Sequence, residues 1–373
     1  MVDLRDCLPR DWENGRFVGR AQSPDGPVVF TIRNGRLFDL TPECASVSGA
    51  IARRQFDGGH DLGPVGDGLP DGWTLLSPID LQCIKASGVT FALSAIERVI
   101  EERARGDAAK ASAIRVQLEE KVGSGIRSVV PGSEDADHLK RVLIDEGMWS
   151  QYLEVAIGPD AEIFSKSPVL SSVGHGSQIG VRSDSAWNNP EPEVVLACDA
   201  VGTVVGATLG NDVNLRDFEG RSALLLSKAK DNTASCAIGP FIRLFDDDFG
   251  IGDVREAVVE LQIEGPDGYR LEGRNVMAEI SRDPLDLVAQ CLSEHHYPDG
   301  FVLFCGTLFA PTQDRDEQGA GFTHKMGDAV TIRSDRIGLL SNTVTTSKAA
   351  PPWETGIGEF VRNLAARGLA EKI

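Results

Sequence analysis

Short alternations of apolar and polar residues fill the first part of the chain. A period of two residues is typical of strands that present one face to a core. The segments that show it are RFVGRAQ (16–22), PVVFTIR (27–33) and GRLFDL (35–40). A stretch rich in Gly and Pro follows from Gly58 to Gly72 and is the best candidate for a linker. We therefore expect a small β-rich domain over residues 1–72.

A helical period replaces this alternation between about residues 93 and 147. Apolar residues recur on one helix face from Leu93 to Ile100. Asp107 is suited to cap a second helix, and Ser133 a third that ends at Gly147. This part of the chain is predicted to be helical.

Apolar runs of strand length return from residue 151. They are YLEVAIG (152–158), EVVLAC (193–198), TVVGATLG (203–210), AVVELQIEG (257–265), GFVLFCGTLFA (300–310) and AVTIRS (329–334). Asp283 and Pro284 begin one interrupting helix, and an amphipathic helix follows Ile357 near the end of the chain. The predicted class is α+β and β-rich, with a second domain over 73–373 that includes the helical segment.

Composition agrees with this class and indicates a compartment. Gly makes up 40 of the 373 residues, about 11% against an ordinary ~7%, which favours many turns. The seven cysteines are widely spaced and include no C-x-x-C pair, as expected of buried thiols in a reducing compartment. The first residues, MVDLRDCLPRDW, are too charged for a signal peptide, and no apolar run is long enough to span a membrane. We expect a soluble cytoplasmic protein.

The charge balance excludes two kinds of partner. There are 56 acidic and 37 basic residues, so the formal net charge is −19. Such a surface repels nucleic-acid phosphates and anionic lipid heads. We therefore expect neither nucleic acid nor a membrane as a partner.

One acidic motif carries candidate chemistry. Glu191 and Glu193 are two residues apart at the start of a strand, so their side chains share one face. After a turn the next strand returns and ends at Asp212, which an antiparallel hairpin brings back to the first strand. Three converging carboxylates suit a hard divalent ion, Mg²⁺ first and Mn²⁺ or Ca²⁺ next. The alternative is a solvated strand face without an ion.

Basic residues follow the motif closely. They are Arg216, Arg221, Lys228 and Lys230. A metal held by three carboxylates remains negative overall, so an anionic substrate would require nearby cations. For Arg221 and Lys228, a solvated face is the favoured interpretation.

Other polar residues are weaker candidates. His175, His295 and His296 lie in Gly- or Pro-containing turns, where histidine more often forms surface hydrogen bonds than it acts as a base or ligand. The run from Asp246 to Asp248 lacks the spacing of an EF-hand and is interpreted as a solvated turn.

Several motifs together resemble the fumarylacetoacetate hydrolase family. They are NPEPEVVL, GATLGNDVNLRD, KAKDNTASCAIGP, PDGFVLFCGT and GFTHKMGDAVTI, in the family's chain order and within about residues 76–345. The resemblance implies a mixed β-roll with peripheral helices behind a small N-terminal domain. It also implies a homodimer or a dimer of dimers.

The resemblance extends to one branch of the family, the dehydratases of 2-keto-3-deoxy-pentonates. It is carried by LLSPIDLQCIKASGVTFALSAIERVIEERARGD and EGRSALLLSKAKDN. It implies a Mg²⁺ ion on three ligands, which are Glu191, Glu193 and Asp212. It further implies that Arg216 and Thr307 bind the substrate and that Lys230 is the active-site lysine. Lys228 is the alternative if the alignment shifts by two residues.

One departure from the family bears on the reaction. The hydrolases carry a His and a Glu that activate water, and the matching stretch here is GVTFALSAIE (88–97). Ser94 replaces the His, whereas Glu97 keeps the Glu position. Without the His a hydrolytic water loses its general base, which favours elimination. The candidate catalytic residues are therefore Glu97, Lys230 and Ser94.

The expected activity is Mg²⁺-dependent dehydration of a small anionic 2-keto acid. The substrate would be 2-keto-3-deoxy-D-xylonate or -arabinonate, and the product 2,5-dioxopentanoate. Two alternatives stay open: a C–C bond hydrolase of 2,4-diketo acids, and a non-catalytic protein that binds a metal and a carboxylate.

Overall fold

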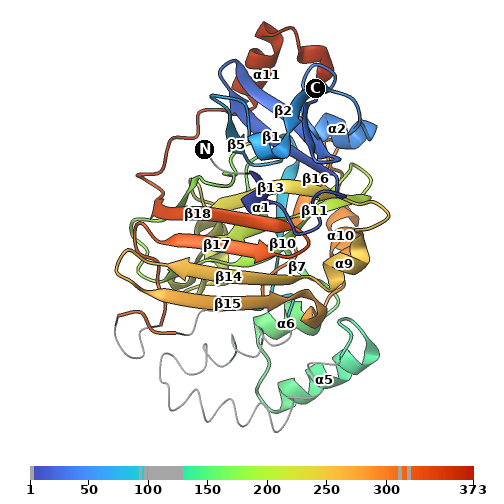
Figure 1. Cartoon of the computed structure of the whole chain (residues 1–373). Helices are drawn as coiled ribbons and strands as arrows, with labels where there is room; N and C mark the ends of the chain where they lie inside the picture. The colour runs from blue at the N-terminus through green and yellow to red at the C-terminus, as the bar shows by residue number, and fades with distance from the viewer. Residues whose placement is uncertain (1–3, 92–94, 96–98, 100–128, 310–312, 317–320) are drawn as a thin grey trace.

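The computed structural model describes residues 4–91, 95, 99, 129–309, 313–316 and 321–373 (Figure 1). The strands of the first sheet that precede residue 77 are β1 (Phe17–Ser23), β2 (Gly26–Arg33), β3 (Arg36–Asp39), β4 (His60–Pro64) and β5 (Thr74–Leu76). Its other strands are β6 (Cys83–Gly88), β7 (Glu162–Ser167), β10 (Pro192–Cys198), β11 (Val204–Asp212), β13 (Cys236–Leu244) and β16 (Phe301–Phe304). The spatial order is β4-β3-β2-β1-β13-β11-β10-β16-β6-β7, and β5 pairs with β1.

A second sheet of five strands lies against the first. It consists of β8 (Gln178–Val181), β14 (Val258–Glu264), β15 (Arg270–Val276), β17 (Ala329–Ser334) and β18 (Gly338–Thr346). Its order is β15-β14-β17-β18-β8. A two-stranded ladder joins β9 (Asn188–Asn189) to β12 (Asn214–Leu215).

Helices surround the sheets. The α-helices are α1 (Leu4–Cys7), α2 (Val47–Arg53), α5 (Glu134–Asp145), α6 (Gln151–Ile157), α7 (Arg216–Glu219), α8 (Leu226–Lys230), α9 (Ile251–Arg255), α10 (Pro284–Leu292) and α11 (Ile357–Ala366). Short 3₁₀ turns are η1 (Val65–Asp67), η2 (Ala223–Leu225), η3 (Met277–Glu279) and η4 (Ala370–Lys372). Within the described ranges, no helix is long and apolar enough to cross a membrane.

The central strand β10 is buried on both faces. Val194 and Leu196 point into a core shared with Leu261 of β14, which is in the second sheet. Val195 and Ala197 belong to another core, on the opposite face of the first sheet. A strand covered on both sides needs a continuous apolar run rather than an alternation, which explains the sequence VVLAC.

The hairpin expected from the acidic motif is confirmed. β10 and β11 are antiparallel, with Glu193 opposite Gly210 and Pro192 opposite Asn211. The backbone N–H of Asp212 donates to the carbonyl of Glu191 at 3.1 Å. The acidic residues at the start of β10 and at the end of β11 are thus brought together.

The helices α5 and α6 lie together at one end of the molecule (Figure 1). The predicted cap of α5 is confirmed, because Ser133 Oγ accepts from the N–H of Ala136 at 3.2 Å. The expectation of a strand over 152–158 is wrong, since α6 occupies this segment. Its Leu153 and Ile157, four residues apart, are buried in one cluster with Leu143 of α5, and this packing requires a helix.

The last helix returns to the first strands of the chain (Figure 1). Asn363 in α11 donates to the carbonyl of Asp25 at 3.1 Å, and Arg367 to that of Pro27 at 2.8 Å. The strands β1 and β13 pair within the same sheet. The domain division near residue 72 stays a prediction.

Candidate active site

Three carboxylates converge where β10 begins and β11 ends. One oxygen each of Glu191, Glu193 and Asp212 lies within 4.8 Å of the others, and all three residues are buried. The hairpin register brings them together, because Glu191 precedes β10 and Asp212 is the last residue of β11. No other group of three potential metal ligands is found among the described residues.

Burial of these like charges is unfavourable. Burial raises the pKa of Glu191, against the opposing effect of the Lys230 ammonium. Burial and the negative charges of Asp212 and Glu191 raise the pKa of Glu193 well above its usual range. A cation at this position would remove the repulsion.

Lys230 supplies one such positive charge. Its Nζ contacts Glu191 Oε2 and lies 2.9 Å from Asp212 Oδ2. Burial disfavours the ammonium, but the charges of Asp212 and Glu191 outweigh this effect and raise the pKa of Lys230. The competing Lys228 is exposed and lies outside the cluster, with Nζ 5.7 Å from the ring centroid of Phe218.

A second buried lysine was not expected from the sequence. Lys166 of β7 is fully buried, and its Nζ lies 2.7 Å from Asp212 Oδ1. The same Nζ donates to the carbonyl of Val213 at 3.2 Å and to that of Lys230. The sequence EIFSKS resembles that of an exposed strand, so no local signal marks Lys166. We call these five residues the carboxylate–lysine cluster: Glu191, Glu193, Asp212, Lys166 and Lys230.

The donor set fits a hard divalent ion. Carboxylate oxygens are the ligands that Mg²⁺ and Ca²⁺ prefer, and thiolate and imidazole ligands, which softer metals favour, are absent from the set. Three carboxylates against two lysines leave one negative charge, so one divalent cation would make the cluster positive. Such a site can therefore accept an anion.

The turn after β16 joins the cluster through its backbone. The N–H of Gly306 donates to Glu193 Oε2 at 2.6 Å. Gly306 has φ of +89°, a conformation that a residue with a Cβ rarely adopts. Thr307 follows directly, and its Oγ1 accepts from the N–H of Phe309 at 3.1 Å. The predicted substrate residue Thr307 thus directly follows a residue whose N–H contacts the cluster.

Arg216 begins α7, four residues after Asp212. It is buried, and its guanidinium carbon lies 4.8 Å from the ring centroid of Trp187. Arg221 is exposed, as expected, and stacks over Phe218 at 4.5 Å. Arg216 is therefore the buried one of these two arginines.

The predicted residues Ser94 and Glu97 lie outside the described residues. His175 is held by protein groups, with Nε2 3.3 Å from Cys7 Sγ and Nδ1 3.1 Å from the carbonyl oxygen of Leu339. His295 is exposed and stacks on Tyr297. None of these histidine contacts involves the cluster.

The remaining weak candidates are His296 and the run from Asp246 to Asp248. His296 is exposed, like its neighbour. Asp246 Oδ1 accepts from the N–H groups of Asp248 and Phe249 at 3.0 and 2.9 Å, so its carboxylate closes a turn. This is the solvated turn that the spacing predicts.

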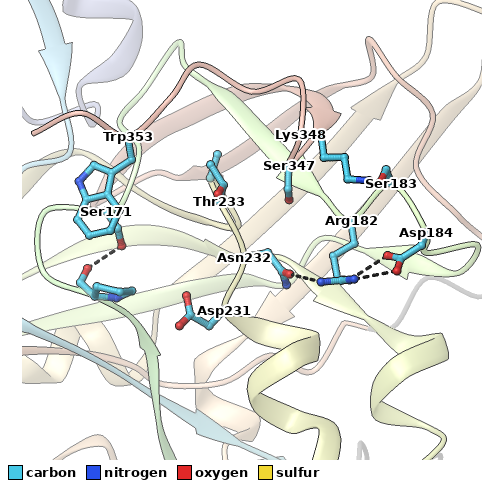
Figure 2. Close-up of a pocket in the computed structure, with 12 residues that line it drawn as sticks. Ser171, Arg182, Ser183, Asp184, Asp231, Asn232, Thr233, Ser347, Lys348 and Trp353 are labelled. Atoms are coloured by element: carbon cyan, nitrogen blue, oxygen red, sulfur yellow. Dashed lines mark hydrogen bonds and ion pairs between the residues drawn. The ribbon is translucent and has the colours of Figure 1, made fainter. Parts of the chain in front are cut away.

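A pocket of about 430 Å³ opens beside the residues that follow Lys230 (Figure 2). Arg182 donates to the carboxylate of Asp184 at 2.9 and 2.7 Å and to Asn232 Oδ1 at 3.3 Å. Figure 2 marks these bonds with dashed lines. Trp353 lines the pocket at the other side. The three carboxylates of the cluster do not line it. The pocket is therefore separate from the cluster, and its arginine is already paired.

Comparison with known proteins gives one family match. A model of the C-terminal part of fumarylacetoacetate (FAA) hydrolase matches residues 158–345, about half of the chain. The matched range contains the three carboxylates, both buried lysines and Thr307.

Two curated relatives are 33% identical to this chain. A probable 2-keto-3-deoxyxylonate dehydratase of Haloferax volcanii aligns over 202 residues, 54% of this chain and 66% of that protein. A 2-dehydro-3-deoxy-D-arabinonate dehydratase of Saccharolobus solfataricus aligns over 154 residues, 41% of this chain and 51% of that protein. The matches thus span about half to two thirds of the length of these relatives.

Solved structures share the fold. A 2-keto-3-deoxy-D-arabinonate dehydratase complexed with magnesium and 2,5-dioxopentanoate is 22% identical, with a TM-score of 0.62 over 89% of this chain and 99% of that one. A fumarylacetoacetate hydrolase of Exiguobacterium antarcticum is 19% identical, with a TM-score of 0.57 over the same shares. The β-rich fold expected from the sequence motifs is confirmed.

Proposed function

This chain belongs to the fumarylacetoacetate hydrolase family, and we propose that it is a Mg²⁺-dependent dehydratase of a 2-keto-3-deoxy-pentonate. The product would be 2,5-dioxopentanoate. The observation that carries the proposal is the charge of the buried carboxylate–lysine cluster. With one divalent cation its net charge becomes +1, which a monoanionic 2-keto acid neutralises.

The ligands of the ion would be Glu191, Glu193 and Asp212. When bound there, Mg²⁺ supplies Lewis acidity to a 2-keto carboxylate and makes its C3 protons more acidic. Lys230, which contacts two of the carboxylates, would stabilise the negative charge that develops as the C3 proton leaves. Lys166 would hold Asp212 in place from the other side.

The substrate carboxylate would be bound by Thr307 and Arg216. Thr307 follows Gly306, whose N–H contacts Glu193, so a ligand held by the three carboxylates would lie close to this turn. The buried guanidinium of Arg216 offers a fixed positive charge after the end of β11. A charged and a neutral donor together orient a carboxylate.

Proton transfer is proposed for Glu97. It would remove the C3 proton or protonate the C4 hydroxyl as it leaves as water, and the resulting enone would tautomerise to the dioxo acid. Ser94 stands where the hydrolases carry a His, so a water would lack its general base. These two roles rest on the sequence resemblance.

The relatives support the dehydratase over other reactions of the family. Both curated relatives are named as dehydratases of five-carbon 2-keto-3-deoxy acids, one for the xylonate and one for the arabinonate. The proposal covers both substrates. We further propose that the protein is cytoplasmic and forms a homodimer or a dimer of dimers. Light scattering of the purified protein would test the oligomeric state.

The alternative within the family is hydrolysis of a C–C bond in a 2,4-diketo acid. It is favoured by the shared fold with the fumarylacetoacetate hydrolase. Incubation with Mg²⁺ and a panel of 2-keto-3-deoxy and 2,4-diketo acids separates the two reactions by product mass. A dehydratase releases one water and leaves the carbon chain intact, whereas a hydrolase produces pyruvate and a second acid. If ligands bind but no acid in the panel is converted, the protein is a binding protein.

A further inference from the structure

Asn275 connects the start of β10 with the turn that carries Thr307. It lies in β15 and is fully buried. Its Nδ2 donates to the carbonyl of Pro192 at 3.2 Å and to that of Gly306 at 3.4 Å. Its Oδ1 accepts from the N–H of Leu308 at 3.1 Å. One side chain therefore joins two segments of the site.

The hydrogen-bond partners of Asn275 are sequence neighbours of the candidate site residues. Pro192 separates Glu191 from Glu193, and Gly306 and Leu308 are the two neighbours of Thr307. An asparagine amide offers two donor hydrogens and one acceptor oxygen, and all three are used here. An aspartate of the same shape would place a second acceptor against two carbonyl oxygens.

A second residue of β15 leaves space for the same turn. Gly273 is two residues before Asn275, so both positions are on one face of the strand. A Cβ atom on Gly273 would lie 2.2 Å from Cε2 of Phe309, which is much closer than van der Waals contact. β15 thus holds the turn with a polar anchor and gives room for its aromatic residue.

We propose that Asn275 is a positioning residue that sets the spacing between the metal-binding carboxylates and Thr307. Glu193 fixes one side of the turn through the N–H of Gly306, and Asn275 fixes both flanks of Thr307. The spacing would determine whether a 2-keto acid held at the three carboxylates also reaches Thr307. This role for the substrate rests on the function proposed above.

The test compares Asn275→Ala and Asn275→Asp with a matched control. Asn342→Ala removes another buried asparagine, whose Nδ2 donates to the carbonyls of Gly174 and Ser177 at 2.9 and 3.0 Å. The readouts are amide hydrogen exchange of the peptide 305–309, and KM and kcat with 2-keto-3-deoxy-D-xylonate and -arabinonate. Circular dichroism checks that each variant is folded.

We expect faster exchange of the peptide 305–309 in Asn275→Ala, because all three hydrogen bonds of the Asn275 side chain are lost. KM should rise about tenfold, with a smaller change in kcat. Asn275→Asp should be worse than Asn275→Ala, because its added oxygen repels two carbonyls. Asn342→Ala should change neither readout. Should Asn275→Asp fail to fold, Asn275→Ser, which keeps one donor, should fall between wild type and Asn275→Ala.

Three results would overturn the proposal or its premise. Unchanged exchange of the peptide 305–309 in Asn275→Ala would show that Asn275 does not hold the turn. Faster exchange with an unchanged KM would show that the turn does not serve the substrate. A wild-type protein that dehydrates neither acid would refute the proposed function, and the exchange data alone would then decide whether Asn275 anchors the turn.

Discussion

The ammonium of Lys166 lies 2.7 Å from Asp212 Oδ1, and both side chains are buried. A second lysine, Lys230, lies 2.9 Å from the other oxygen of the same carboxylate. Asp212 is therefore held between two ammonium groups. Removing either lysine is costly, because one ammonium group then remains to offset three buried carboxylates.

Lys166→Met is expected to destabilise the metal-free protein by about 1.5–3 kcal/mol, since Asp212 loses one of its two cations and keeps the other. A divalent ion replaces part of the lost charge. Addition of Mg²⁺ should therefore raise the melting temperature of the variant more than that of the wild type. Calorimetric melting with and without Mg²⁺ measures both the loss of stability and the rise in melting temperature that Mg²⁺ causes. An equal Mg²⁺-dependent rise in both proteins would contradict this account of Lys166.

Lys230→Met is expected to lower kcat by about 10²–10³-fold, because a preorganised positive charge is lost where negative charge develops. Lys228→Met is the matched control, two residues earlier in the same short helix and exposed. Steady-state rates with a 2-keto-3-deoxy-pentonate and saturating Mg²⁺ give the comparison. Equal losses in the two variants would reject the assignment of Lys230.

Glu193→Gln removes one buried negative charge but keeps an acceptor for the N–H of Gly306. We expect the metal-free variant to be more stable than the wild type by on the order of 1 kcal/mol, because repulsion with Asp212 and Glu191 is relieved. The variant should also lose most of its Mg²⁺ affinity, as titration calorimetry would show. Wild-type affinity for Mg²⁺ in Glu193→Gln would exclude Glu193 as a ligand.

The buried ion pair of Asp328 and Arg315 should make the stability of the protein depend on pH. Asp328 is buried, and although burial opposes ionisation, Arg315 and His324 lower its pKa from 3.8 to about 2. A carboxyl with a lowered pKa in the folded state stabilises the protein above its unfolded pKa, and this contribution is lost as the pH falls through the folded pKa. Stability should therefore decline between about pH 4 and 2, by about 2 kcal/mol from this group. In Asp328→Asn, denaturant unfolding over this range should show a shallower decline; an unchanged slope would reject the assignment.

Much of the site could be predicted because local patterns encode it. Glu191 and Glu193 flank one residue at the start of an apolar run, and the length of the returning strand places Asp212 beside them. The hairpin needs no long-range information. The roles proposed for Thr307 and Arg216 required the family resemblance.

Other features depend on contacts distant in sequence. Lys166 and Asn275 come from strands with ordinary polar alternation, and only the packing of those strands brings them to the site. The segment 152–158 has the residues of a strand, but Leu153 and Ile157 match the helical packing surface of α5. Tertiary packing overrides local preference in such short segments.

The most direct test of the central claim is a time course of product mass. Purified protein is incubated with 2-keto-3-deoxy-D-xylonate or -arabinonate in three states: with Mg²⁺, after exhaustive chelation, and after Mg²⁺ is restored. We predict a product one water lighter, which reacts as an aldehyde, only when Mg²⁺ is present. The account would be contradicted by dehydration that survives chelation, or by an unchanged pentonate under conditions in which a 2,4-diketo acid is cleaved to pyruvate.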